Sequence, residues 1–189
     1  MGRWKPDTSG RLERAAIELY LENGFAQTTV QQITERAGVT TRTFFRHFVD
    51  KRDVLFTGHD ELRERVAKTI AAAPPAWSAA RTAASGLNIA AAALQLRQDE
   101  AKDRRRLITL TPELRERELI MFAAVADTIA EALSARGVEE RTARVTAEAM
   151  VAAFRVAFEL WGDQPERELP QLVDEVLDSL RETLGGPGN

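Results

Sequence analysis

The stretch TTVQQITERAGVTTRTFFRHF, Thr28–Phe48, contains two short segments with helical spacing of apolar residues, separated by a single glycine. Thr29 can cap the first segment, and Gln32, three positions later, can complete a capping box. Gly38 follows at the position where a left-handed residue commonly ends a helix. Thr40 can then cap the second segment. The stretch therefore predicts two helices joined by a tight turn.

The second of these helices, Thr41–His47, carries hydroxyl, guanidinium and imidazole groups. Phe44 and Phe48 are four residues apart, so both can lie on the face that packs against the rest of the domain. The other faces are then available for polar contacts. This is the layout of a helix-turn-helix, whose second helix enters the major groove of DNA. We therefore interpret the stretch as a DNA-binding motif.

The second helix and its surroundings supply the candidate contacts with DNA. The Arg42 guanidinium could bind O6 and N7 of a guanine, or a phosphate instead. Lys51 and Thr29 each lie at an expected helix start, where backbone N–H groups can bind a phosphate. Thr43 could reach a base edge or only face the Thr40 cap, and Phe45 could stack on a sugar or pack locally. The candidate DNA-binding residues are Thr29, Thr40, Thr41, Arg42, Thr43, Phe45, His47 and Lys51.

The charge distribution is compatible with DNA binding near the N-terminus. The whole chain has a net charge of −3, but residues 1–53 contain nine Lys and Arg against seven Asp and Glu. Because binding responds to the local potential, an acidic distal part can coexist with a basic face. We therefore divide the chain after Asp53. The distal run Arg104-Arg105-Arg106 has acidic neighbours, so we expect it to form solvated, salt-bridged surface; the alternative is a role in holding an acidic effector.

The remainder of the chain shows apolar residues at spacings of three and four, which is typical of helices. We expect a helix from Lys51 to about Ala72, one or two helices over 77–97, and a helix over 113–136. The most regular stripes lie in the last two helices, Glu139–Trp161 and Leu169–Leu184. Such stripes are typical of core positions or of a subunit interface. The predicted fold class is all-α, with a three-helix N-terminal domain and about nine helices in total.

Nothing in the sequence indicates catalysis, a cofactor or a membrane span. The chain has no cysteine, and its two histidines, His47 and His59, are not spaced as metal ligands. It contains no glycine-rich phosphate loop. The alanine-rich stretch Ile70–Leu94 is interrupted by two prolines and by Arg81, so we do not expect it to cross a membrane. We expect a cytoplasmic protein without enzymatic activity, cofactor or metal.

The first third of the chain resembles the TetR family of bacterial transcriptional regulators. The resemblance covers the first-helix sequence RLERAAIELYLENGF at Arg11–Phe25, the segment TTVQQI, the recognition segment AGVTTRTFFRHF, and Asp50-Lys51-Arg52 with the apolar residues that follow. Two positions depart from the family pattern. Arg42 stands where glycine is common, and Phe45 stands where tyrosine is common, which removes a hydroxyl that often reaches a phosphate in relatives.

This resemblance implies how the rest of the protein would work. In the family the last two helices of each subunit pack as a four-helix bundle, which points to Glu139–Trp161 and Leu169–Leu184 as the homodimer contact. A small-molecule effector normally lies between the fourth helix and the helices that follow, and its binding moves the two recognition helices on a near-palindromic operator. By resemblance, His47 would donate to a phosphate, and Arg3 in the N-terminal arm could reach the minor groove.

These implications give the predicted function. We expect a helix-turn-helix DNA-binding domain at 1–53, a helical effector-binding and dimerisation domain at 54–189, and a dimeric repressor that a hydrophobic or aromatic effector releases from its operator. The alternative is an architectural DNA binder, or a regulator without a small-molecule effector. For each candidate pocket residue the alternative is a place in the ordinary core. The candidate pocket residues are Trp77, Leu87, Leu94, Met121, Phe122, Phe154 and Phe158.

Overall fold

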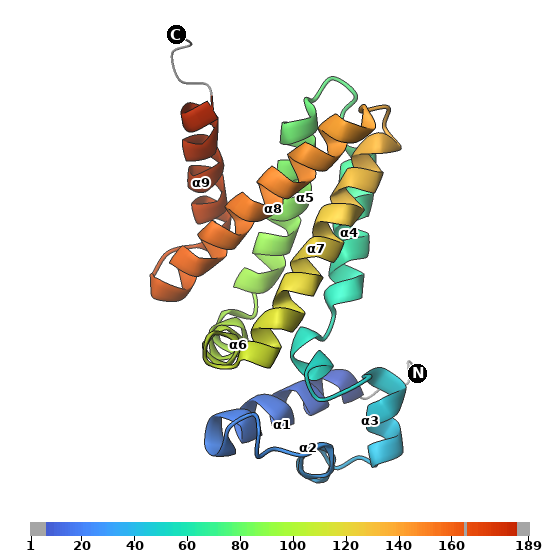
Figure 1. Ribbon diagram of the computed structural model, residues 1–189, viewed down its shortest axis with the longest axis vertical. Helices are drawn as coiled ribbons and strands as arrows, with labels where there is room; N and C mark the ends of the chain where they lie inside the picture. Colours follow the sequence, from blue (N-terminus) through green and yellow to red (C-terminus); the bar gives the residue numbers. More distant parts are fainter. Residues whose placement is uncertain (1–6, 165, 185–189) are drawn as a thin grey trace, which may run out of the picture. The chain divides into compact units, whose positions relative to one another are not determined.

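The computed structural model describes residues 7–164 and 166–184, so the predicted minor-groove contact of Arg3 lies outside the described residues. Within the described part the chain forms nine α-helices, one 3₁₀ helix and no strand, which confirms the all-α fold class. The helices are α1 (Thr8–Asn23), α2 (Val30–Ala37), α3 (Thr41–His47), η1 (Asp53–Phe56), α4 (His59–Ala72), α5 (Ala79–Gln95), α6 (Gln98–Leu110), α7 (Pro112–Ser134), α8 (Glu140–Asp163) and α9 (Leu169–Leu184) (Figure 1).

The two helices of the predicted motif begin and end as their sequence indicates. Thr29 Oγ1 accepts from Gln32 N at 3.2 Å, and Gln32 Oε1 accepts from Thr29 N at 2.8 Å, so the capping box of α2 is complete. Gly38 ends α2 with a left-handed φ of 67°. Thr40 Oγ1 accepts from Thr43 N at 3.1 Å and caps α3. The helix-turn-helix therefore follows from interactions between near neighbours in the sequence.

The chain divides into two compact units. The first unit consists of Met1–His59 and Lys102–Glu118, and the second unit consists of Asp60–Ala101 and Leu119–Asn189. The core of the first unit includes the fully buried Leu12, Ile33 and Phe44 from the N-terminal helices. It also includes side chains from the second segment, namely Leu107, Ile108 and Leu114. Residues far from the N-terminus in sequence thus complete the hydrophobic core around the helix-turn-helix.

The expected helix from Lys51 to about Ala72 is interrupted. Asp50 Oδ1 accepts from Arg52 N at 2.7 Å and from Asp53 N at 3.3 Å, which closes a turn and leads into the 3₁₀ helix η1. Gly58, with a φ of 77°, then separates η1 from α4. The prediction of one continuous helix was therefore wrong at its N-terminal end, because a side-chain-capped turn and a left-handed glycine replace the first helical turns.

The second unit contains α4, α5, α8, α9 and most of α7 (Figure 1). α5 is continuous, so the one or two helices expected over 77–97 are a single helix. A methyl group at Gly86 would come within 3.0 Å of Val66 Cγ1 and 3.1 Å of Ile70 Cγ1. Glycine therefore allows α5 to pack closely against α4 at this position. Among the described residues no helix is long and apolar enough to cross a membrane.

The last two helices pack within their own chain. α8 buries Ala147, Phe154 and Trp161, and α9 packs against both α5 and α8. The apolar stripe of α9, including Leu172 and Val173, is buried in the core of the second unit. The side chain of Gln95, the last residue of α5, caps the N-terminus of α9. Figure 1 shows α5 and α9 together with α8. The backbone N–H of Leu169 donates to Gln95 Oε1 at 2.8 Å.

Candidate DNA-binding interface and ligand-binding core

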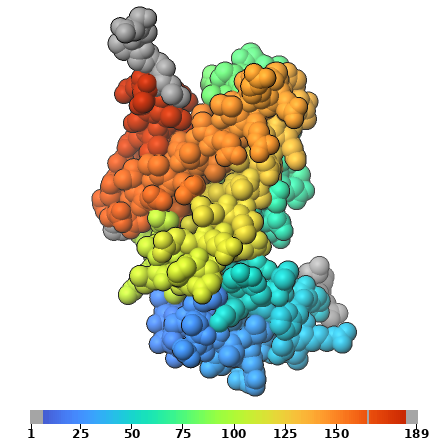
Figure 2. Space-filling model, viewed as in Figure 1, coloured from blue at the N-terminus to red at the C-terminus, as the bar shows by residue number. Residues whose placement is uncertain are grey.

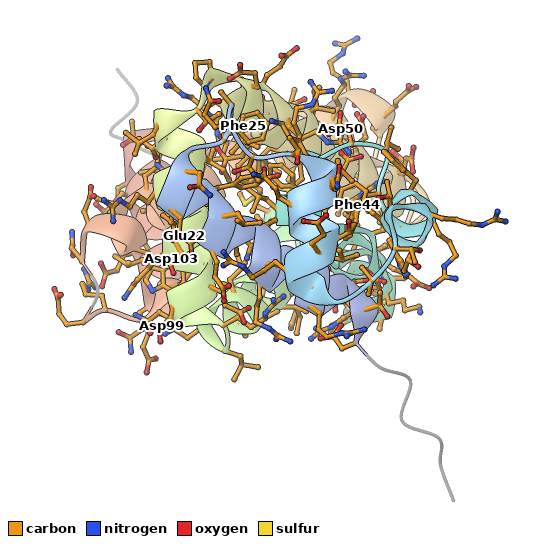
Figure 3. All side chains as sticks on the ribbon, turned by 90° about the horizontal axis from the view of Figure 1, so that it is seen from below. Glu22, Phe25, Phe44, Asp50, Asp99 and Asp103 are labelled. Carbon is orange, nitrogen blue, oxygen red and sulfur yellow. The ribbon has the colours of Figure 1, made fainter. Side chains whose placement is uncertain are left out.

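The aromatic residues of α3 anchor it and leave its polar face open. Phe44 is fully buried, and its ring centroid lies 5.4 Å from that of Phe45 and 5.3 Å from that of Phe48. Figure 3 shows the first unit from the side of α2 and α3, with Phe44 labelled. Phe45 itself is 56% exposed. Six of the candidate contact residues are exposed, namely Thr29, Thr40, Thr41, Arg42, Phe45 and His47.

Two candidate residues of α3 have partners within the protein. Thr43 is half-buried, and its hydroxyl lies 2.9 Å from that of Thr40, so it takes part in the cap as one of the two sequence interpretations expected. His47 Nδ1 lies 3.3 Å from the hydroxyl of Ser9 in α1, and its Nε2 lies 3.4 Å from an Arg46 nitrogen. The imidazole therefore links the end of α3 to the start of α1.

The Lys51 ammonium closes the loop that precedes α2. Its Nζ donates to the carbonyl oxygen of Phe25 at 2.8 Å and to that of Thr28 at 2.9 Å. The same ammonium lies 4.3 Å from the centroid of the Phe25 ring, a cation–π geometry. Burial lowers the pKa of Lys51. A structural role for this side chain was not foreseen, because its partners precede it by more than twenty positions.

Tyr20 in α1 completes the same junction. Its hydroxyl donates to the backbone oxygen of Lys51 at 2.6 Å. Burial, and to a smaller extent the charge of Asp50, raises the pKa of this hydroxyl. Figure 3 labels Phe25 and Asp50 on the two loops that Lys51 and Tyr20 hold. Tyr20 was not singled out from the sequence, although a lone tyrosine in an otherwise apolar helix face indicates that a hydroxyl needs a partner.

Arg104 of α6 places a positive charge in the first unit. Arg104 Nη1 donates to the carbonyl oxygen of Leu55 at 3.1 Å and lies 3.8 Å from Glu13 Oε1. The Glu13 side chain is only 1% exposed, and that of Arg104 is 13% exposed. The expected solvated surface was therefore wrong for Arg104. Helical spacing places it on the face of Leu107 and Ile108, which packs into the core.

The second unit contains a row of aromatic rings on α7 and α8. Ring centroids are 6.5 Å apart for Phe122 and Phe154, 6.4 Å for Phe154 and Phe158, and 5.8 Å for Phe158 and Trp161. Trp161 is fully buried at the end of the row and was not among the predicted pocket residues. In the part of the chain that the structure describes, no cluster of ligating side chains could hold a metal ion. The side chains of this row are aromatic, and the Arg155 guanidinium lies 5.7 Å from the centroid of the Phe122 ring.

The other predicted pocket residues fall into two groups. Leu87 is buried in the same core, and Leu94 and Met121 pack against it while half-buried. Trp77 lies outside this cluster, and its ring is stacked 4.3 Å from the Arg81 guanidinium. The structure thus brings six of the seven predicted pocket residues to one core. Whether they contact an effector stays a prediction.

The outer face of α8 carries apolar side chains that are exposed in the described part of the chain. Val145, Ala152, Val156 and Leu160 are exposed, and Ala149 between them is half-buried. Their spacing of three and four residues places them on one stripe of the helix. Figure 2 shows part of the α8 surface, in orange, uncovered on this side of the second unit. Among the described side chains of the last two helices, the exposed apolar stripe therefore belongs to α8, whereas the main stripe of α9 is buried in the core.

Comparison with known protein families gives two matches that together cover most of the chain. Residues 13–57 match the family described as bacterial regulatory proteins, tetR family. Residues 74–185 match the family described as MftR C-terminal domain. The first match contains the helix-turn-helix, and the second contains α5 and every later helix of the structure.

Individual relatives extend this comparison. A protein of Mycobacterium tuberculosis named for transcriptional regulation of mycofactocin biosynthesis, MftR, is 27% identical over 191 residues, which cover 98% of this chain and 89% of the relative. The transcriptional regulator TcmR of Streptomyces glaucescens is 50% identical over 50 residues, 26% of this chain and 22% of its own length. The repressor FadR of Thermus thermophilus, solved with lauroyl-CoA, has a TM-score of 0.58 at 23% identity, with 96% and 100% coverage, and shows the same fold.

Proposed function

The chain belongs to the TetR family of bacterial transcriptional regulators, and we propose that it is a dimeric repressor that a small, largely apolar effector releases from a near-palindromic operator. The observation that carries this proposal is the construction of α3. Its buried Phe44 fixes the helix, while Thr41, Arg42 and His47 are exposed. We further propose that the protein has no catalytic activity and acts in the bacterial cytoplasm, where its DNA lies.

In this proposal α3 lies in the major groove. Arg42 reads a guanine, and the hydroxyl of Thr41 contacts a neighbouring base edge. Phosphate contacts fix the register of the helix on the duplex without reading sequence. His47 donates to one phosphate. The start of α2 at Thr29 and the start of η1 near Lys51 each lie beside another phosphate. Phe45, which is exposed and lacks a hydroxyl, packs on a sugar of the DNA backbone.

Two copies of this unit are needed for tight and specific binding. A dimer places two recognition helices about one DNA turn, ~34 Å, or a multiple of it apart, and so selects a near-palindrome. We propose that the dimer forms through α8 and α9, with Val156 and Leu160 of α8 contributing exposed apolar surface. Burial of this surface between two subunits would give the non-directional stabilisation that a subunit interface requires.

The effector site in this proposal is the aromatic core of the second unit. Phe122, Phe154 and Phe158 present ring faces and edges, and the Arg155 guanidinium lies 5.7 Å from the centroid of the Phe122 ring. Such a core suits an acyl chain or an aromatic compound better than a polar metabolite. The Thermus thermophilus relative was solved with lauroyl-CoA, which makes this compound the first ligand to test. A ligand that binds the native state should raise the melting temperature by mass action.

The experiment that tests the proposal is selection of bound DNA from a random pool with the purified protein. Recovery of a near-palindromic motif at moderate salt supports the dimeric regulator. Recovery of no motif, with general binding that weakens steeply as salt rises, favours the architectural alternative instead. Adding lauroyl-CoA to the complex with the selected operator then tests release. Stable binding to a selected operator, without release or thermal stabilisation by lauroyl-CoA or other apolar ligands, favours a regulator controlled by something other than a small molecule.

A further inference from the structure

The carboxylate of Asp53 touches two elements that are distant in the sequence. Asp53 Oδ2 accepts a hydrogen bond from the backbone N–H of Val49, the second residue after α3, at 3.2 Å. The other carboxylate oxygen, Oδ1, lies 2.7 Å from Nε of Arg117 in α7. The Asp53 side chain is 15% exposed, so this carboxylate is largely shielded from solvent. A single side chain therefore joins the end of the recognition helix to α7.

Both sides of this joint are fixed by buried neighbours. Val54 and Leu55, which directly follow Asp53, are fully buried in the core of the first unit. Leu114, one helical turn before Arg117, is fully buried in the same core. Asp53 and Arg117 thus project from backbone that packing holds in place. A shift of either backbone would change the Asp53–Arg117 contact rather than be absorbed by a flexible chain.

α7 continues without interruption from the first unit into the second. Its residues up to Glu118 belong to the first unit, and its residues from Leu119 belong to the second. Arg117 and Phe122 are five residues apart on this helix, about 7.5 Å along its axis at 1.5 Å per residue. Phe122 is the α7 member of the aromatic row. Movement of Phe122 along the helix axis would therefore move Arg117 as well.

We propose that Asp53 is a positioning residue through which α7 fixes the end of the recognition helix. Arg117 holds the carboxylate, the carboxylate holds the Val49 N–H, and that N–H sets where α3 ends. The geometry of the operator-binding surface then depends directly on α7, the helix that also carries Phe122. This inference rests on the proposed function for its consequence on DNA, but the Arg117–Asp53–Val49 linkage can be measured without DNA.

The test compares Arg117→Met, Asp53→Asn and the double variant, with Arg106→Met as the matched control. Arg106 lies on α6 in the first unit and is exposed, so its replacement removes the same charge without touching the joint. Three quantities are measured on the full chain: affinity for the selected operator, melting temperature, and amide hydrogen exchange at Val49. Arg117→Lys, which restores a positive donor, is the rescue variant.

We expect Arg117→Met to weaken operator affinity at least ten-fold more than it weakens binding to unrelated DNA, and to accelerate exchange at Val49. The double variant should be no weaker than the worse single variant, because both remove one linkage. Arg117→Lys should recover part of the loss, and Arg106→Met should leave exchange at Val49 unchanged. Should Arg117→Met fail to fold, Arg117→Gln takes its place with the same expectations.

Two results would overturn the inference. One is additive losses in the double variant, since independent contributions would mean that Asp53 does not act through Arg117. The other is normal exchange at Val49 in a folded Arg117 variant, whatever its affinity for DNA. If the unaltered protein selects no operator, the proposed function fails instead. The exchange at Val49 then still decides whether Arg117 holds the end of α3.

Discussion

At the scale of single residues, Arg42 is the sharpest test of sequence readout by α3. Its guanidinium is exposed near the N-terminus of the helix, in a position that the family often fills with glycine. Arg42→Ala should cost about 1–3 kcal/mol of discrimination at one base position in each half-site. Arg42→Lys keeps the charge but not the forked geometry, so it should also lose the base preference. Binding measured on an operator library checks this, and uniform weakening at every position would make Arg42 a phosphate contact.

Lys51 gives the second prediction at this scale. Lys51→Met removes the charged donor from the carbonyls of Phe25 and Thr28, so we expect the free energy of unfolding to fall by about 1–3 kcal/mol. If Lys51 also binds a phosphate, the slope of log affinity against log salt should become less steep. Chemical denaturation and salt titration measure the two effects. Lys68→Met, at an exposed α4 ion pair, is the control and should change stability by less than about 1 kcal/mol.

At the scale of elements, the start of α8 depends on a carboxylate. The Glu139 side chain accepts hydrogen bonds from the backbone N–H groups of Arg141 and Thr142, and these bonds lower its pKa below the usual value. Because the pKa of the Glu139 carboxyl is lower in the folded state than in the unfolded chain, the cap contributes its full stabilisation at pH values above the unfolded-state pKa. The stabilisation is lost as pH falls through the folded pKa. The cap therefore weakens under acid conditions, at a lower pH than for an ordinary glutamate.

An NMR titration of the Thr142 amide tests this cap. Its chemical shift should change with a midpoint below the ordinary glutamate value of 4.5. Glu139→Gln should abolish the transition, because an amide side chain does not titrate. A midpoint at or above the ordinary value would show that the carboxylate does not cap α8 in solution.

The elements also show why some of the structure followed from the sequence. The caps of α2 and α3 depend on Thr29 with Gln32 and on Thr40 with Thr43, pairs only three residues apart. Interactions between residues this close in the sequence can be predicted from residue type and spacing alone. The anchoring of α3 by Phe44 was likewise readable from its helical spacing.

Other features depend on partners that are distant in the chain. The Lys51 side chain contacts the protein itself because the carbonyls of Phe25 and Thr28 lie next to it in the fold. The Arg104 side chain is largely buried because the part of α6 around it packs into the core of the first unit.

The apolar stripe of α9 could not be assigned from its sequence for a different reason. Leu172 and Val173 have the spacing of a core face or of an interface, and only the packing on α5 and α8 distinguishes the two. Charge at Val173 would therefore disrupt the core itself and could not report on dimerisation alone.

At the scale of the whole molecule, the prediction of a dimer is tested by a substitution on α8. Val156 is 48% exposed on the open stripe, so Val156→Glu should leave the fold intact and produce monomers. Loss of the dimer should remove operator binding, because one recognition helix alone binds weakly. Ile120→Glu, at a position on α7 that is 53% exposed, is the matched control and should stay dimeric. Sedimentation velocity separates the two forms, and a stable Val156→Glu dimer would place the interface elsewhere.

The first unit is assembled from two pieces of sequence, and this limits how the protein can be recombined. A chimera that joins residues 1–59 to the ligand-binding part of another regulator would lose Leu107, Ile108 and Leu114 from the core around the helix-turn-helix. It would also lose Arg104 beside the buried Glu13. A helix-turn-helix unit that is to be transplanted, for example into a biosensor, must therefore include Lys102–Glu118. A chimera that keeps this unit intact therefore needs three crossover points in the sequence, after residues 59, 101 and 118, and not one.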